Sequence, residues 1–152
     1  MSVSPTTGRH AGAARGSVLL TLALATGSFG IGTGEFAVMG LLPDIASDLG
    51  VSVPAAGYLI SAYALGVVVG APMIAVLGAR ISRRTLLILL MLGFCLGNLA
   101  SAAAPTIGTL TALRFLSGLP HGAYFGVAAL VAAASAPPDG RAQAVGRVML
   151  GL

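Results

Sequence analysis

Three side chains that can carry or exchange a charge lie in otherwise apolar stretches of this sequence: Glu35, Arg114 and His121. An imidazole takes up and releases protons near neutral pH, and a carboxylate with a nearby counter-charge can be linked to proton uptake. A charge at the centre of a bilayer costs about 2.5–3.5 kcal/mol on insertion scales, so it usually faces a cavity or a partner. If these stretches cross a membrane, the three residues are candidates for a proton or substrate pathway.

The composition assigns the chain to the membrane proteins. Of its 152 residues, 57% are hydrophobic and 8% are charged, and the mean hydropathy is +0.98. A soluble domain carries roughly 25% charged residues, whereas uncharged stretches here exceed the roughly 20 residues that a spanning helix needs. These values exclude a water-soluble domain.

The apolar stretches predict an all-α membrane protein with four spanning helices and the start of a fifth. Abundant alanine, glycine and leucine argue against a β-barrel, which shows alternating segments about ten residues long. The polar segment 1–16 is expected to be a disordered cytoplasmic tail that precedes a bundle over 17–152. The expected helices are 17–42, 55–77, 85–103 and 107–134, and the fifth begins near 142.

Arginines mark alternate links between the expected spans. The N-terminal segment, the second link and the fourth link carry them, whereas the other two links contain neither arginine nor lysine. Because cytoplasmic links are enriched in basic residues, the N-terminus is predicted to be cytoplasmic and the link with Asp44 and Asp48 to face outward. The arginines outside the spans are Arg9, Arg15, Arg80, Arg83, Arg84, Arg141 and Arg147.

Several kinds of function are not expected. The formal net charge is +4, but the arginines sit in short juxtamembrane links, so no nucleic-acid partner is expected. The single Cys95 has no partner in the chain for a disulfide or a cysteine metal site. The chain has no lysine and no phosphate-binding glycine loop, which favours the proton gradient as an energy source. Neither a cofactor nor an enzyme activity is expected.

Glu35 and Arg114 are predicted to lie at the same depth. The first span runs outward and the fourth runs inward, and each residue is about two helical turns from the outer end of its span, roughly 10 Å below the outer boundary. Opposite charges at one depth fit a buried ion pair, or a proton-linked carboxylate with its counter-charge. In the alternative, each side chain reaches the interface from near a helix end. The spacing favours neither.

His121 follows Arg114 by about two helical turns and therefore lies on the same helix face, near the middle of the membrane. It is either a site of proton exchange or a neutral side chain that is hydrogen-bonded within the bundle. Pro120, beside it, frees the carbonyl of Leu116 from its helical hydrogen bond, so a kink is expected in this helix.

Glycines recur at a spacing of four residues along the expected spans. Small residues at that spacing let two helix backbones approach closely. We therefore expect packing contacts at these glycines, including Gly118 and Gly122 beside the expected kink. The other spaced glycines are Gly30, Gly34, Gly66, Gly70, Gly93, Gly97 and Gly126.

The first two spans resemble those of the major facilitator superfamily, in its drug:proton antiporter group of arabinose-efflux-like and chloramphenicol-resistance-like permeases. The matching stretch is GTGEFAVMGLLPDIASDLGVSVPAAGYLISAYALGVVVGAP, and its most specific part is EF…MGLLPDIA. In the fourth span, GLPHGAYFG resembles the arabinose-efflux-like branch. The resemblance covers nearly all of the chain after the tail.

The second link resembles a cytoplasmic loop pattern of the superfamily, G-x-L-A-D-R-x-G-R-[RK]. Arg80, Arg83 and Arg84 match its basic positions, but Ala79 stands where the pattern has an aspartate. In the family this aspartate helps to hold a latch between helices. The three arginines are therefore either a cytoplasmic gating loop or anchors of the topology.

The fourth span resembles the superfamily's fourth-helix pattern, R-x-x-Q-G-x-G. Arg114 and Gly118 match it, with Ser117 in place of the glutamine and Pro120 in place of the second glycine. The resemblance implies that Arg114 lies inside the helix, faces the cavity and is linked to proton coupling. It likewise favours Glu35 as a membrane-embedded acid near the substrate path.

The resemblance implies a proton-coupled carrier that exports small organic molecules, such as drugs or sugars, by alternating access in the bacterial inner membrane. Its partners would be a small-molecule substrate, protons and membrane lipid. Such carriers have twelve helices in two halves, with the site between the halves. This chain is therefore expected to be a portion that further C-terminal helices complete. The alternative is a non-transporting tetraspan protein that assembles with or regulates other membrane proteins.

The alternating arginines give a topology that can be tested. Asp48→Cys and Arg83→Cys, each in a Cys95→Ala background, should be labelled from opposite sides of the membrane in intact cells. Position 48 should react with an impermeant thiol reagent, and position 83 should react only after permeabilisation. Labelling of position 83 alone from outside would show that the topology is inverted.

Overall fold

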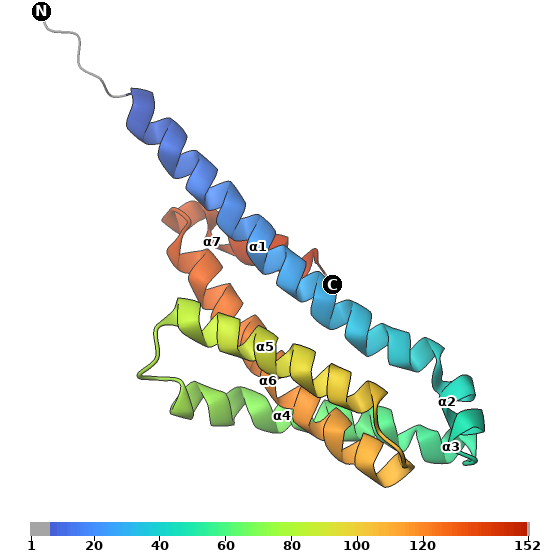
Figure 1. Ribbon diagram of the computed structural model, residues 1–152. Helices are drawn as coiled ribbons and strands as arrows, with labels where there is room; N and C mark the ends of the chain where they lie inside the picture. Colours follow the sequence, from blue (N-terminus) through green and yellow to red (C-terminus); the bar gives the residue numbers. More distant parts are fainter. Residues whose placement is uncertain (1–6, 152) are drawn as a thin grey trace, which may run out of the picture.

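The computed structural model describes residues 7–151, which form helices joined by short links (Figure 1). No strand occurs within that range. The elements are α1 (Thr7–Gly40), α2 (Leu42–Asp48), α3 (Val53–Ala56), α4 (Tyr58–Leu77), α5 (Arg83–Ala102), α6 (Ile107–Ala134), the 3-10 turn η1 (Pro138–Gly140) and α7 (Arg141–Met149).

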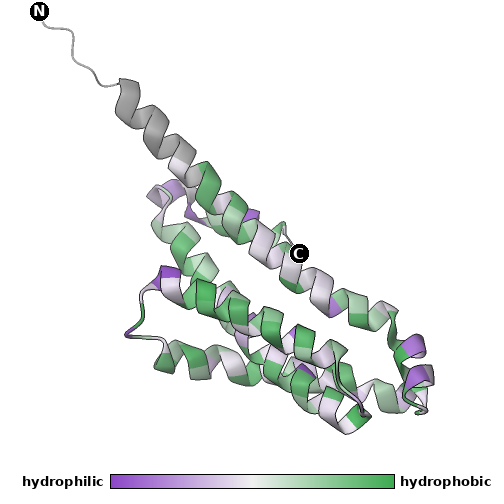
Figure 2. Cartoon of the chain, in the orientation of Figure 1, coloured by the Kyte–Doolittle hydropathy of each residue, from purple (hydrophilic) through white to green (hydrophobic). Residues whose placement is uncertain are grey.

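Among residues 7–151, four helical segments are long and apolar enough to cross a membrane, which confirms the predicted all-α membrane fold. They are Val18–Gly40, Val53–Leu77, Arg83–Ala102 and Ile107–Ala134. Hydrophobic residues run along the helices, and hydrophilic ones gather at the links (Figure 2). The expected fifth helix corresponds to α7.

The first helix begins earlier than the sequence indicated. We expected a disordered tail over 1–16, but α1 already starts at Thr7. The segment HAGAARG is rich in alanine and arginine, which favour helix, so the apolar span extends backward as one continuous helix. Residues 1–6 lie outside the described residues.

Side-chain caps set the start of three helices. The hydroxyl groups of Ser52, Ser82 and Thr106 accept hydrogen bonds from backbone amides three residues further along, at distances of 3.3, 3.2 and 3.2 Å. Such caps satisfy amides that have no partner inside the helix. They fix where α3, α5 and α6 begin, and hence the register of the polar side chains that follow.

Glycine also shapes the link after α1. Gly50 has a φ of 64°, in the left-handed region that a residue with a Cβ rarely adopts. The amide of Val51 then donates to the carbonyl of Ala46 at 2.9 Å, which closes the end of α2. This turn returns the chain from α1 toward α4.

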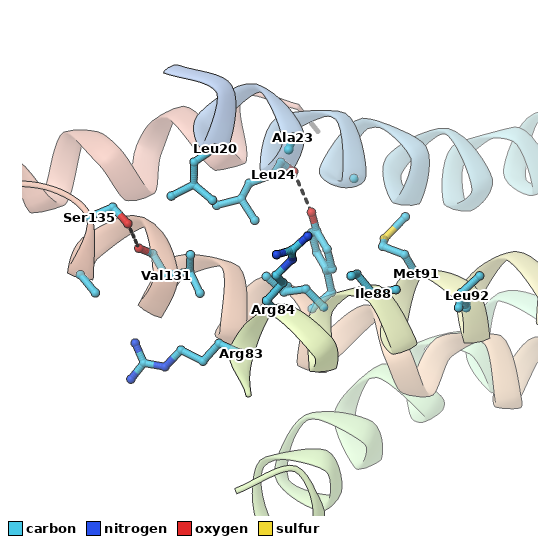
Figure 3. Close-up of a pocket in the computed structure, with 14 residues that line it drawn as sticks. Leu20, Ala23, Leu24, Arg83, Arg84, Ile88, Met91, Leu92, Val131 and Ser135 are labelled. Atoms are coloured by element: carbon cyan, nitrogen blue, oxygen red, sulfur yellow. Dashed lines mark hydrogen bonds between the residues drawn. The ribbon is translucent and has the colours of Figure 1, made fainter. Parts of the chain in front are cut away.

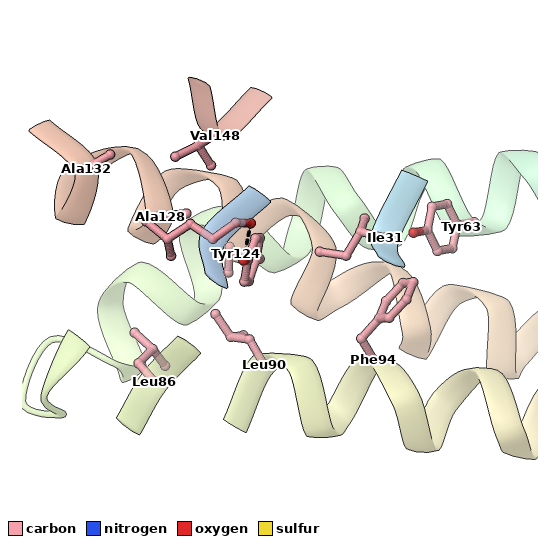
Figure 4. Packing of buried hydrophobic residues seen from close by; sticks show 11 residues of the cluster. Ile31, Tyr63, Leu86, Leu90, Phe94, Tyr124, Ala128, Ala132 and Val148 are labelled. Atoms are coloured by element: carbon pink, nitrogen blue, oxygen red, sulfur yellow. Dashed lines mark hydrogen bonds between the residues drawn. The ribbon is translucent and has the colours of Figure 1, made fainter. Parts of the chain in front are cut away.

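Helix α6 is the central element of the bundle. It packs most extensively against α4, then against α5 and α7, whereas α1 packs mainly against α7 and contacts α6 and α5 only sparsely. A cluster of buried hydrophobic side chains joins these helices (Figure 4). It consists of Leu24, Ile31, Tyr63, Leu86, Leu90, Phe94, Ala123, Tyr124, Ala128, Ala132 and Val148.

The contact between α4 and α6 depends on glycines from both helices. A Cβ at Gly66 would meet the carbonyl oxygen of Phe115, and one at Gly118 would meet the carbonyl oxygen of Tyr63. Gly70 and Gly122 face the partner backbone in the same way. Because none of these positions has room for a side chain, the two backbones can lie directly against each other.

The other spaced glycines differ in their surroundings. Gly97 packs on Ser117, and Gly34 packs on Phe94 and Asn98. Gly30 and Gly126 have open space beside them. The spacing alone therefore does not identify which glycines make contacts, because one helix presents several faces with the same repeat.

A pair of substitutions tests the close approach of α4 and α6. Gly122→Ala should lower the free energy of unfolding, because the added methyl group would meet the carbonyl oxygen of Val67, and overpacking of this kind costs about 1–3 kcal/mol. Gly126→Ala, in open space on the same helix, is the control and should be neutral or slightly stabilising. Unfolding in detergent micelles measures both, and equal stabilities would contradict the proposed role of the contact.

Candidate functional site

Arg114 lies within α6 and is only 2% exposed. Its Cζ atom sits 4.1 Å from the centroid of the Tyr63 ring, a cation–π contact with α4. Its Nη1 donates a hydrogen bond to Oδ1 of Asn98 on α5, at 3.3 Å, while its buried Nε has no hydrogen-bond partner. This burial argues against the alternative in which Arg114 reaches the membrane interface from a helix end.

Asn98 is held in the orientation that serves Arg114. Its Nδ2 donates to the carbonyl of Phe94, one turn earlier in α5, at 2.8 Å. This bond uses the amide's donor side and leaves Oδ1 to accept from the guanidinium. The sequence analysis did not select Asn98, although it is the only asparagine in the chain and lies inside a predicted span.

His121 lies further along α6, between side chains of α4 and α1. Its Nδ1 is 2.7 Å from the Tyr63 hydroxyl and 3.9 Å from Oε2 of Glu35. The rings of Tyr63 and Phe125 flank the imidazole, with centroids 5.5 and 5.2 Å from its own. The Glu35 side chain is 34% exposed, so His121 has one buried partner and one partly open partner.

Together these residues form a continuous series of contacts that we call the polar cluster: Glu35, His121, Tyr63, Arg114 and Asn98. The series runs from α1 through α6 and α4 to α5. Tyr63 is its centre, because the ring face contacts the guanidinium and the hydroxyl contacts the imidazole. Sequence reasoning missed Tyr63, which a search for every polar side chain inside the spans would have found.

The structure brings Glu35, Arg114 and His121 together, but the Glu35 carboxylate has a different partner from the one expected. Between Glu35 and Arg114 the described residues form no ion pair within 4.0 Å; the carboxylate instead faces His121. The guanidinium turns to Tyr63 and Asn98 because these side chains lie closer on the helices packed against α6.

The residues assigned to the expected kink lie in the buried middle of α6. Gly118 and Pro120 are buried, and Gly122 is half-buried. The helix continues through Pro120 without a break. Gly118 and Gly122 face α4, where a Cβ would meet the carbonyl oxygens of Tyr63 and Val67, respectively.

Arg80, Arg83 and Arg84 lie at the link between α4 and α5 and are exposed. None of them makes an ion pair with the rest of residues 7–151. Arg83 and Arg84 occupy the first turn of α5 and line a cavity of about 770 Å³ between α1, α5 and α6 (Figure 3). The structure therefore offers these three guanidinium groups no acidic partner of the kind that the loop pattern uses.

Two cavities lie toward opposite ends of the helices, on either side of the polar cluster. The first, which we call the Tyr124 cavity, is the one lined by Arg83 and Arg84, and its other walls are almost entirely apolar. In it, the Tyr124 hydroxyl donates to the carbonyl of Leu24 on α1, at 2.8 Å. The second, the Arg114 cavity, has about 390 Å³ and is lined by Asp48, Asn98 and Arg114 among others.

Across the described part of the chain, no group of three or more His, Cys, Asp or Glu side chains could hold a metal ion. Cys95 is exposed on α5. What the polar cluster can do chemically is hold a buried positive charge and exchange protons at an imidazole and a carboxylate.

Comparison with known proteins identifies the class of protein that this fold and site define. The model of the Major Facilitator Superfamily matches residues 24–152, so the chain belongs to that superfamily. This confirms the resemblance found in the sequence, and it favours a carrier over a non-transporting tetraspan protein. No solved structure matches the chain.

Several curated relatives resemble the chain closely. The Escherichia coli inner membrane transport protein YdhP is 54% identical over 131 residues, which is 86% of this chain and 34% of YdhP. The putative transporter AraJ of the same species is 43% identical over 86% of this chain and 33% of its own length. The chloramphenicol resistance protein of Streptomyces lividans is 43% identical over 80% of this chain and 32% of its own. The chain thus spans about a third of the length of these relatives.

Substitution of Asn98 tests the support of the buried guanidinium. Asn98→Leu should lower the free energy of unfolding by about 1.5–3 kcal/mol, because Arg114 would lose the Asn98 acceptor of its guanidinium hydrogen bond while remaining buried. Asn98→Asp keeps an acceptor and should retain most of the stability. Cys95→Leu, an exposed site on the same helix, controls for the added apolar side chain. If Asn98→Leu unfolds like the parent in micelles, the Asn98 bond does not hold Arg114.

Proposed function

We propose that this chain forms part of a proton-coupled carrier that exports small organic molecules across the bacterial inner membrane. The observation that carries the proposal is the polar cluster, in which side chains from four helices surround a buried guanidinium and an imidazole. Membership of the superfamily supports transport as the activity. The names of two relatives, an inner membrane transport protein and a chloramphenicol resistance protein, support the inner membrane as the location and small organic molecules as the substrate class.

If the polar cluster had only a structural role, the free-energy cost of burying its charges would serve no purpose. A guanidinium at membrane depth is expensive to insert, and two apolar side chains would pack the same space without that cost. Glu35 and His121 add two groups that can gain and lose protons, next to the fixed charge of Arg114. A carrier driven by the proton gradient uses such groups, because their charge changes as the proton binds and leaves.

The two cavities are candidate access routes for alternating access. The Tyr124 cavity lies toward the end with Arg83 and Arg84. The Arg114 cavity includes Arg114 and Asn98 of the polar cluster and lies toward the end with Asp48. If the arginine links face the cytoplasm, the first cavity is the inner one and the second the outer one. The polar cluster would then be reached from one side at a time, exchanging protons and substrate in turn while lipid surrounds the bundle.

The proposal can be tested in a chimera, because the chain corresponds to about a third of YdhP at 54% identity. This chain would replace the matching part of YdhP, and the purified chimera would be placed in vesicles with an imposed proton gradient. Chloramphenicol is the first probe, chosen from the name of the Streptomyces relative. Transport that persists unchanged without a proton gradient would contradict the coupling.

Three variants of the chimera test the polar cluster. Arg114→Ala and Glu35→Gln should abolish proton-driven transport, since each removes one of the charges that surround the proton site. Arg114→Lys keeps the charge but loses the planar guanidinium over the Tyr63 ring, so it should restore transport only in part. Expression and folding of each variant are checked by size-exclusion chromatography. Parent-like transport in all three would remove the polar cluster from the mechanism.

A further inference from the structure

A single atom, Nδ1 of His121, has two candidate partners. The Tyr63 hydroxyl lies at hydrogen-bond distance, 2.7 Å, and the Glu35 carboxylate lies just beyond it, at 3.9 Å. A ring nitrogen is either a bare acceptor or a protonated donor. When it is bare, it can accept only from the Tyr63 hydroxyl, because a carboxylate has no proton to give. When it is protonated, the carboxylate is the stronger acceptor.

The two partners lie on helices that pack against α6 to very different extents. Tyr63 belongs to α4, whose backbone lies against α6 at Gly66 and Gly118, so its distance from His121 is fixed by the close contact of two backbones. Glu35 belongs to α1, which contacts α6 only sparsely. The distance from Glu35 to His121 can therefore change without disturbing the α4–α6 pair.

Few other charged or titratable groups face His121. Arg114, on α6, lies on the far side of the Tyr63 ring, and α5 contributes the uncharged amide of Asn98, which is bonded to Arg114. On α7, Arg141 and Arg147 are exposed. The charge on His121 is thus opposed by one cation and favoured by one carboxylate.

We propose that Nδ1 of His121 is the atom that binds the coupled proton, and that binding exchanges its Tyr63 partner for Glu35 and draws α1 toward α6. The site deepens the proposed function and depends on it only for the coupling to transport. It selects one of the three sequence candidates as the proton acceptor and gives Tyr63 a positioning role.

The proton balance is simple. In the neutral state the Tyr63 hydroxyl donates to bare Nδ1, and Nε2 carries the ring hydrogen. A proton from water then adds to the Nδ1 lone pair, Tyr63 keeps its own proton and turns it away, and Nδ1–H donates to the Glu35 carboxylate. The distance from Nδ1 to Oε2 must shorten from 3.9 Å to the ordinary range of about 2.7–3.2 Å. Release of the proton reverses each step.

The composition of the chain makes this site accessible to NMR. There are two histidines, so His10→Gln leaves His121 as the only one, and Glu35 is the only glutamate. Protein labelled with 15N-histidine and 13C-glutamate in lipid nanodiscs then contains one Glu–His spin pair. In the neutral state, Nδ1 should be the bare nitrogen. On acidification it should gain the proton, and its distance to the Glu35 carboxyl carbon should shorten by about 1 Å.

Two variants with matched controls make the test specific. Tyr63→Phe removes the hydroxyl that donates to Nδ1, so neutral His121 should become a mixture of its two tautomers. Tyr124→Phe removes a hydroxyl that bonds Leu24 instead, so this variant should behave like the parent. Glu35→Gln should lower the ratio of charged to neutral His121 at about pH 6 roughly tenfold, whereas Asp48→Asn should leave it unchanged. Far-UV circular dichroism checks that each variant is folded.

The outcomes separate this inference from the proposed function. A neutral ring protonated on Nδ1, or a charge ratio unaffected by Glu35→Gln, would overturn the inference even if the chimera transports. A titration as expected, with no proton-driven transport in the chimera, would overturn the proposed function and leave the proton site in place. Both readouts as expected would support the complete proposal.

Discussion

The close approach of the α4 and α6 backbones is the contact on which the rest of the bundle depends. Gly66 and Gly70 on one helix, and Gly118 and Gly122 on the other, leave no side chain between the two backbones. Membrane helices gain little from hydrophobic association, so this van der Waals contact supplies much of what holds the pair together. It also fixes where Tyr63 stands relative to two residues of α6, Arg114 and His121.

In the polar cluster, only a few groups stabilise the buried guanidinium of Arg114 within the described residues. Arg114 has no carboxylate within ion-pair distance in the described chain; a ring face and one amide oxygen stabilise it instead. Its Nε has no hydrogen-bond partner among the described residues.

Helix α1 contacts the other spanning helices only sparsely. Its main polar contact with α6 is the hydrogen bond that the Tyr124 hydroxyl donates to the carbonyl of Leu24, and much of its remaining contact is with α7. Glu35, near the other end of α1, faces His121 across a distance that no hydrogen bond fixes.

The class of the protein, the number of its predicted spans and its family could all be inferred from the sequence. Long uncharged stretches allow only helices in a bilayer, because every backbone polar group must be paired within the segment, and Glu35, Arg114 and His121 stood out because charge is costly there. The partners of these residues were decided only by the tertiary structure. Glu35 faces His121 instead of Arg114, and Tyr63 and Asn98 complete the polar cluster. Counting residues along separate helices gives neither the relative depth nor the direction of two side chains, because both depend on the tilt and rotation at which the helices pack. For α4 and α6, that rotation is set by the glycines whose contacts the repeat alone could not identify.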